Sequence, residues 1–188
     1  PESTGKTTLT KQLAQHFKTN WAPEFARDYL QQKWNNTQGI CEPNDLLPIA
    51  VGQIQLENTA LLTANKLLFC DTNLMVTKVF SEIYYNFCDP ALDKAALKHK
   101  YDLFFLTDVD VPWEKDDLRD APQQREMTFD VFKKALIDNE KPFITLSGNP
   151  TYMTLTTNGV SNPCPVGAGQ TISLAPLQSC HMLLKYGP

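Results

Sequence analysis

The chain has 188 residues and a net charge of −4, from 17 basic and 21 acidic side chains, and 42% of its residues are hydrophobic. This length suits one domain with a sizeable core, and the composition excludes a chain that is disordered or fibrous throughout. The small negative charge gives no indication of binding to nucleic acid or to an anionic membrane surface. Because no apolar run approaches the ~18 residues of a membrane span and no signal peptide is visible, we expect a cytoplasmic protein.

Charge is distributed unevenly along the chain. Lys185 is the only charged residue from 149 to 188, and the same stretch holds 5 of the 13 prolines and 4 of the 8 glycines. We therefore expect a folded domain over residues 1–149 and an atypical, low-charge tail over 150–188. The five cysteines are odd in number and lack metal-binding spacing, which favours reduced, structural thiols.

Hydrophobic spacing predicts helices that alternate with short buried strands. An amphipathic helix is expected over 6–18. The other predicted elements are an extended stretch over 20–23, helices over 24–34 and 46–62, a strand over 67–70, helices over 75–87 and 90–98, a strand over 103–106, a helix ending near 140 and a strand over 143–146. The helix over 46–62 is apolar enough to be largely buried. This alternation favours an α/β fold in which helices cover both faces of a mostly parallel sheet.

The first seven residues, PESTGKT, follow the order of a phosphate-binding loop, GxxxxGK[ST], without its leading glycine. Gly5 can adopt the positive φ that lets backbone N–H groups converge on a phosphate at a helix N-terminus. Lys6 offers a point charge to the β- and γ-phosphates, and the Thr7 hydroxyl can ligate Mg²⁺. The motif therefore predicts a nucleoside triphosphate site.

A carboxylate on the magnesium side of such a site is expected at the end of a neighbouring strand. Asp71 follows the apolar run 67–70 and fits that position, although read alone it is equally a solvated acid at a strand end. Glu24 and Arg27 stand one helical turn apart, so they could face one site as a proton acceptor and an anion-binding group, or form a surface ion pair.

The charged segment 113–120 lies between a strand and a helix. In a phosphoryl-transfer fold it could be a lid that excludes water and brings Arg119 or Arg125 to the transferring phosphate, or it could be a solvated face.

These motifs together resemble the nicotinamide riboside kinase domain of NadR-type NAD biosynthesis proteins. The resemblance covers residues 1–149 and rests on PEFARDYL, on CDT followed by TKVFSE, and on PWEKDDLR. It implies a three-layer P-loop kinase fold that passes the γ-phosphoryl group of ATP to the 5′-hydroxyl of nicotinamide riboside, with Mg²⁺ as the metal.

The resemblance also assigns site residues. Nucleotide would be bound by Ser3, Thr4, Gly5, Lys6, Thr7, Thr8 and Arg119, with the metal at Thr7 and Asp71. Catalytic roles would fall to Lys6, Glu24, Asp71 and Arg119, and riboside binding to Glu24, Arg27, Gln53, Tyr84 and Trp113. Whether Glu24 or Asp71 is the base stays open. Phosphorylation of another nucleoside or nucleotide, and a non-catalytic nucleotide-binding module or inactive remnant, are the alternative functions.

Three departures from the family pattern accompany the resemblance. Asn73 stands where the family has an acid, and Asp117 where it has glycine. The tail after residue 149 lacks the family's charged helix, which we interpret as an out-of-frame or aberrant gene end. We also expect the first, central strand to lie before Pro1, which would leave two neighbouring strands without a partner. The histidines form no nucleotidyl-transfer motif, so no adenylyltransferase activity is expected.

Overall fold

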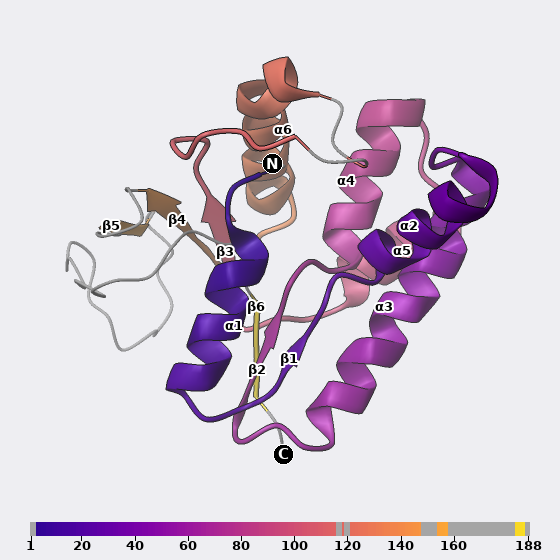
Figure 1. The fold of residues 1–188 in the computed structure, drawn as a ribbon. Helices are drawn as coiled ribbons and strands as arrows, with labels where there is room; N and C mark the ends of the chain where they lie inside the picture. The colour runs from indigo at the N-terminus through magenta and orange to yellow at the C-terminus, as the bar shows by residue number, and fades with distance from the viewer. Residues whose placement is uncertain (1–2, 116–117, 119–120, 148–153, 158–182, 187–188) are drawn as a thin grey trace.

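The structure is a computed structural model that describes residues 3–115, 118, 121–147, 154–157 and 183–186 (Figure 1). The helices are α1 (Lys6–His16), α2 (Phe25–Thr37), α3 (Leu46–Leu61), α4 (Leu74–Tyr85), α5 (Pro90–Lys98) and α6 (Arg125–Asp138), with short 3₁₀ turns η1 (Pro43–Asp45) and η2 (Pro122–Gln124). The strands are β1 (Trp21–Ala22), β2 (Leu67–Cys70), β3 (Leu103–Thr107), β4 (Phe143–Ser147), β5 (Thr154–Thr157) and β6 (Leu183–Tyr186). No described helix is long and apolar enough to cross a bilayer.

The strands form one six-stranded sheet in the order β1-β2-β6-β3-β4-β5. β1 is parallel to β2 and β3 is parallel to β4, while β6 is antiparallel to both β2 and β3. β1 to β4 therefore all run in one direction, and their carboxyl ends lie at the same edge. This architecture confirms the expected α/β fold; the sheet is mixed, with β1 to β4 parallel to one another and β5 and β6 antiparallel to their neighbours. β6 occupies the central position between β2 and β3.

Helices cover both faces of the sheet (Figure 1). On one face, Leu9 and Leu13 of α1 pack with Phe69 and Leu146 of the sheet. On the other face, residues of α4 and α6 pack against Ala22 and the alternate residues of β2, β3 and β4, and together they form the largest core cluster. Successive strand residues point to opposite faces of the sheet, and helices cover both faces. Both sets of residues are therefore apolar, which explains why the strands are short apolar runs rather than alternating sequences.

Most predicted elements occur within a few residues of their expected bounds, and local capping explains the differences. α4 begins at Leu74 because the Asn73 side chain accepts a hydrogen bond from the Val76 N–H (3.1 Å), and it ends at Tyr85 because the next residue, Asn86, has a φ of 50°. The expectation that the helix over 46–62 is largely buried is only partly met, since Leu47 and Val51 on the outer face of α3 are 39% and 56% exposed.

Candidate functional site

The phosphate-binding loop leads from the sheet edge into α1. Ser3 and Gly5 both have positive φ, 51° and 73°, and α1 begins at the next residue, Lys6. This backbone pattern turns successive N–H groups toward one point, which suits an anion. The loop is anchored to the sheet, because the Thr107 hydroxyl at the end of β3 donates to the Thr4 hydroxyl oxygen over 2.9 Å in the buried interior.

Thr7 and Asp71 meet at the end of β2. The Thr7 hydroxyl donates to Asp71 Oδ2 over 2.5 Å, and Asp71 is 1% exposed. Burial raises the pKa of Asp71, although the bond from Thr7 and the positive charges of Lys6, Lys11 and Arg27 oppose that rise. Its second oxygen, Oδ1, is buried and has no hydrogen-bond partner among the described residues. A hydroxyl beside a buried, unsatisfied carboxylate oxygen is a donor set that fits Mg²⁺.

The segment after β3 is fastened to the phosphate-binding loop. The Glu114 N–H donates to Ser3 Oγ over 2.7 Å. Arg125, the first residue of α6, donates from Nη2 to the carbonyl oxygens of Val111 (2.9 Å) and Ser3 (3.3 Å). Burial lowers the pKa of Arg125, and the nearby Asp110 carboxylate opposes that shift. Arg125 thus holds the loop and the segment together through their backbones, while Arg119 and Asp117 lie outside the described residues.

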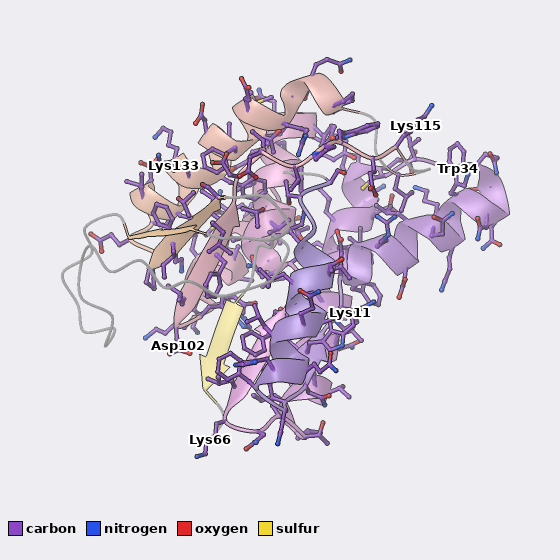
Figure 2. The ribbon with its side chains drawn as sticks, turned by 60° about the vertical axis from the view of Figure 1, so that its left-hand side comes forward. Lys11, Trp34, Lys66, Asp102, Lys115 and Lys133 are labelled. Atoms are coloured by element: carbon purple, nitrogen blue, oxygen red, sulfur yellow. The ribbon has the colours of Figure 1, made fainter. Side chains whose placement is uncertain are left out.

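A cleft of about 1260 Å³ extends from the phosphate-binding loop between α1, α2 and α4. Its lining includes Glu24, directly before α2, and Arg27 in the first turn of that helix. Figure 2 labels two further lining residues, Lys11 on α1 and Trp34 on α2. The parts of the lining that belong to α2 and α4 include four aromatic side chains, namely Trp34, Phe80, Tyr84 and Tyr85.

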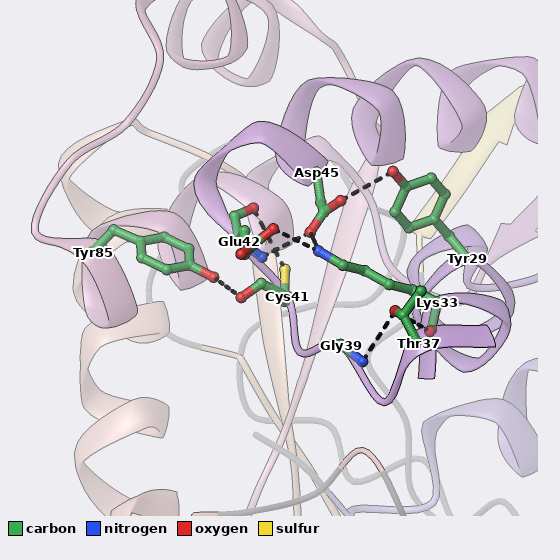
Figure 3. Close-up of polar contacts among 8 residues, drawn as sticks. All are labelled: Tyr29, Lys33, Thr37, Gly39, Cys41, Glu42, Asp45 and Tyr85. Atoms are coloured by element: carbon green, nitrogen blue, oxygen red, sulfur yellow. Dashed lines mark hydrogen bonds and ion pairs between the residues drawn. The ribbon is translucent and has the colours of Figure 1, made fainter. Parts of the chain in front are cut away.

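A polar network holds the wall of the cleft formed by residues 39–41 (Figure 3). Asp45, which is 7% exposed, accepts hydrogen bonds from Tyr29 Oη (3.0 Å), Lys33 Nζ (2.7 Å) and the Glu42 N–H (2.8 Å). Burial by itself raises the pKa of Asp45, but these three donors hold it below its ordinary value. On the other side, Tyr85 Oη donates to the Cys41 carbonyl oxygen over 2.8 Å. The wall is therefore tied to α2 and to α4.

The structure brings most of the predicted site residues to this one cleft: Ser3, Thr4, Gly5, Lys6, Thr7, Thr8, Glu24, Arg27, Gln53, Asp71 and Tyr84 all line it. Trp113 is not among its described lining residues, and the indole Nε1 of Trp113 is buried. Asn73 caps α4, so its amide oxygen is engaged there.

Sequence reasoning missed Lys11, Trp34 and Tyr85 as lining residues. Lys11 lies four positions after Thr7 on the same predicted helix, so the two residues share one helix face, and this spacing was the one available signal. Trp34 and Tyr85 belong to helices whose relative positions the sequence does not reveal.

The fold and the loop define a P-loop protein of the nucleotide-binding α/β class. Residues 1–151 match the family described as "AAA domain", and the chain belongs to that family. It is 33% identical over 118 residues to the trifunctional NAD biosynthesis/regulator protein NadR of Salmonella typhimurium, and equally to that of Escherichia coli. Each match covers 63% of this chain and 29% of the relative, so the chain spans less than a third of these relatives.

A solved structure shares the fold. It is described as the crystal structure of NadR protein in complex with NR, and it superposes with a TM-score of 0.63 at 19% identity, covering 79% of this chain and 44% of that one. The resemblance to the NadR-type domain and the P-loop kinase fold are thereby confirmed.

Proposed function

We propose that the domain over residues 1–149 transfers the γ-phosphoryl group of ATP to the 5′-hydroxyl of nicotinamide riboside. The observation that carries this proposal is one cleft whose lining holds the phosphate-binding loop together with Glu24, Arg27 and aromatic residues. The NadR relatives are NAD biosynthesis proteins by name, and the solved NadR structure holds NR, which we take as nicotinamide riboside. Together these findings support a role in NAD biosynthesis.

The loop side of the cleft suits the triphosphate. The N–H groups of residues 3–8 and the Lys6 ammonium group would bind the β- and γ-phosphates. Thr7 and Asp71 would hold Mg²⁺, since the buried Asp71 Oδ1 has no other partner among the described residues. When bound, Mg²⁺ neutralises charge on the phosphate oxygens and so favours transfer.

The other side suits a flat, cationic nucleoside. A pyridinium ring is attracted to the faces of aromatic side chains, and Trp34, Tyr84 and Tyr85 supply such faces. Arg27 could bind the ribose or the new phosphate. In the transfer, the bond from the β,γ-bridging oxygen to the γ-phosphorus breaks, a bond from the 5′-oxygen forms, and ADP leaves. The hydroxyl proton passes to Glu24 in our scheme, and Asp71 is the alternative acceptor.

The assay is transfer of radiolabelled phosphate from ATP to nicotinamide riboside, uridine, thymidine and their monophosphates. We expect the riboside to be preferred, and equal or greater transfer to another acceptor would refute the assignment. Glu24→Gln should reduce turnover with little change in riboside affinity if Glu24 is the base. Glu126→Gln, the same change at an exposed position of α6, is the matched control.

A non-catalytic nucleotide-binding module is the second candidate, because this chain covers only 29% of each NadR relative. Binding of MgATP without transfer to any acceptor would favour it. In the kinase proposal, Arg119 remains the lid arginine and Trp113 a substrate-binding candidate. Their substitution by Lys and Phe, with transfer as the readout, tests both assignments.

A further inference from the structure

Gln53 uses both ends of its side-chain amide inside the protein. It is 2% exposed on α3, its Oε1 accepts from the Phe25 backbone N–H over 3.0 Å, and its Nε2 donates to Glu57 Oε1 over 3.5 Å. One neighbour is a donor and the other an acceptor, so the amide fits in one orientation only. Both ends being engaged, Gln53 is better suited to hold the protein in place than to bind a ligand.

Glu57, one turn further along α3, is held from the opposite side. It is 0% exposed, and Tyr101 Oη lies 2.9 and 2.8 Å from its two carboxylate oxygens. His99 Nε2 lies 3.5 Å from Glu57 Oε2, and the His99 ring packs on Tyr101 with centroids 4.8 Å apart. We call Gln53, Glu57, His99 and Tyr101 the Gln53 network. Gln53, Glu57 and Tyr101 are buried, and the network links α3 to the residues just before β3.

The network ends at the beginning of α2. Phe25 is the first residue of that helix, and its N–H is one of the four that a helix leaves without an internal partner. Gln53 supplies the partner. Glu24 directly precedes this N–H and has an extended backbone (φ −73°, ψ 105°), and Arg27 lies in the same turn. Gly52, which directly precedes Gln53, adds a second constraint on the start of α2, because the Phe25 ring packs directly against it.

We propose that the Gln53 network positions the acceptor side of the cleft: it sets where Glu24 and Arg27 stand relative to the hydroxyl that receives the phosphoryl group. The proposal rests on the proposed function above. Gln53, Glu57 and Tyr101 act as positioning residues and reach the reacting atoms only through α2. Because an error of about 1 Å in a reacting group can reduce a rate ~100-fold, a buried hydrogen bond at this place controls turnover.

A pair of exchanged residues tests the proposal. Gln53→Glu places a second carboxylate against Glu57, so the network loses a donor and gains a like charge. Gln53→Glu combined with Glu57→Gln keeps an acceptor for the Phe25 N–H and restores a donor between the two side chains. We expect the single variant to lose about tenfold or more in kcat with the riboside while its MgATP affinity is unchanged, and the double variant to recover most of it. Gln55→Glu, the same change at an exposed position of α3, is the control.

The outcomes separate positioning from general stability. The proposal would be overturned if Gln53→Glu lowered kcat, MgATP affinity and the unfolding midpoint together. It would also be overturned if the double variant recovered stability but not kcat. If Gln53→Glu does not fold, Tyr101→Phe takes its place, because it removes one donor to Glu57 and keeps the shape of the ring. Its kcat should lie between that of the native chain and the loss of about tenfold expected for Gln53→Glu.

If the native chain transfers no phosphate to the riboside, the proposed function fails and the network is tested by hydrogen exchange. The Phe25 amide should exchange faster in Gln53→Glu than in the native chain and in the double variant. Equal exchange in all three would refute the inference itself.

Discussion

Replacing Gly52 by alanine should destabilise the protein, although the same change in most helices stabilises it. A Cβ at residue 52 would stand 2.2, 2.3 and 2.4 Å from three carbons of the Phe25 ring. Carbon atoms pack best at ~3.5–4.0 Å, so the ring must recede by about 1 Å or more. Overpacking of this kind costs ~1–3 kcal/mol, which exceeds the gain of up to ~1 kcal/mol that alanine brings to a helix interior.

The effect on turnover should be larger than the effect on stability. A shift of Phe25, the first residue of α2, would displace the first turn of that helix, and Glu24 and Arg27 stand in or next to that turn. A displacement of about 1 Å predicts a loss of up to ~100-fold in kcat with the riboside. MgATP affinity should change little, because the three atoms nearest to a Cβ at residue 52 all belong to Phe25 and none to the phosphate-binding loop.

A double-mutant cycle measures the contact. Urea unfolding should show that Gly52→Ala lowers the free energy of unfolding in the native background but leaves it unchanged or raises it in a Phe25→Ala background. The coupling between the two positions should be about 2 kcal/mol. If Gly52→Ala stabilises the chain in both backgrounds and leaves kcat unchanged, the reasoning from this close approach is refuted.

Three further predictions concern the loop and the cleft wall. Thr7→Val removes the hydroxyl that donates to Asp71, so MgATP affinity measured by calorimetry should fall about tenfold or more while metal-free ATP binding changes less. Arg125→Ala removes two backbone contacts, so proteases should cut the 108–115 segment faster; unchanged cutting would argue against the clamp. Asp45 has a pKa below its ordinary value of 3.8 in the fold, so its charge stabilises the protein above that value and loses this effect as pH falls through the lowered pKa. The difference in melting temperature between the native chain and Asp45→Asn should therefore be largest near neutral pH and shrink below about pH 4.

The parts of the fold that sequence predicts well are those fixed by local physics. The strand at 67–70 is a run of four apolar residues before an acid, and its helix neighbours carry their own caps at Asn73 and Asp89. The phosphate-binding loop is local in the same sense, since the positive φ of Gly5 follows from its own sequence. For these reasons the bounds of β2, α5 and the start of α1 agree with expectation.

The parts of the fold and of the site that the sequence does not predict depend on which distant segments come into contact. The resemblance makes Gln53 a candidate for riboside binding, but the sequence does not show that the Phe25 N–H and Glu57 lie on either side of its amide. β5 and β6 lie in the low-charge stretch 150–188. β5 pairs with β4, the strand just before it in the chain, but the partners of β6, β2 and β3, are remote in sequence. Non-local pairing of this kind leaves no periodic signal in the chain.

The central place of β6 has a consequence for how the sheet assembles. β6 is the only described strand that joins the β1–β2 pair to the β3–β4–β5 group, and it is the last of them to be synthesised. The two halves can form early from nearby segments, but their union must await closure of a loop that spans most of the chain. On the ribosome, the nascent protein would therefore emerge as two part-sheets, each with an unpaired edge toward the other, until residues 183–186 leave the exit tunnel.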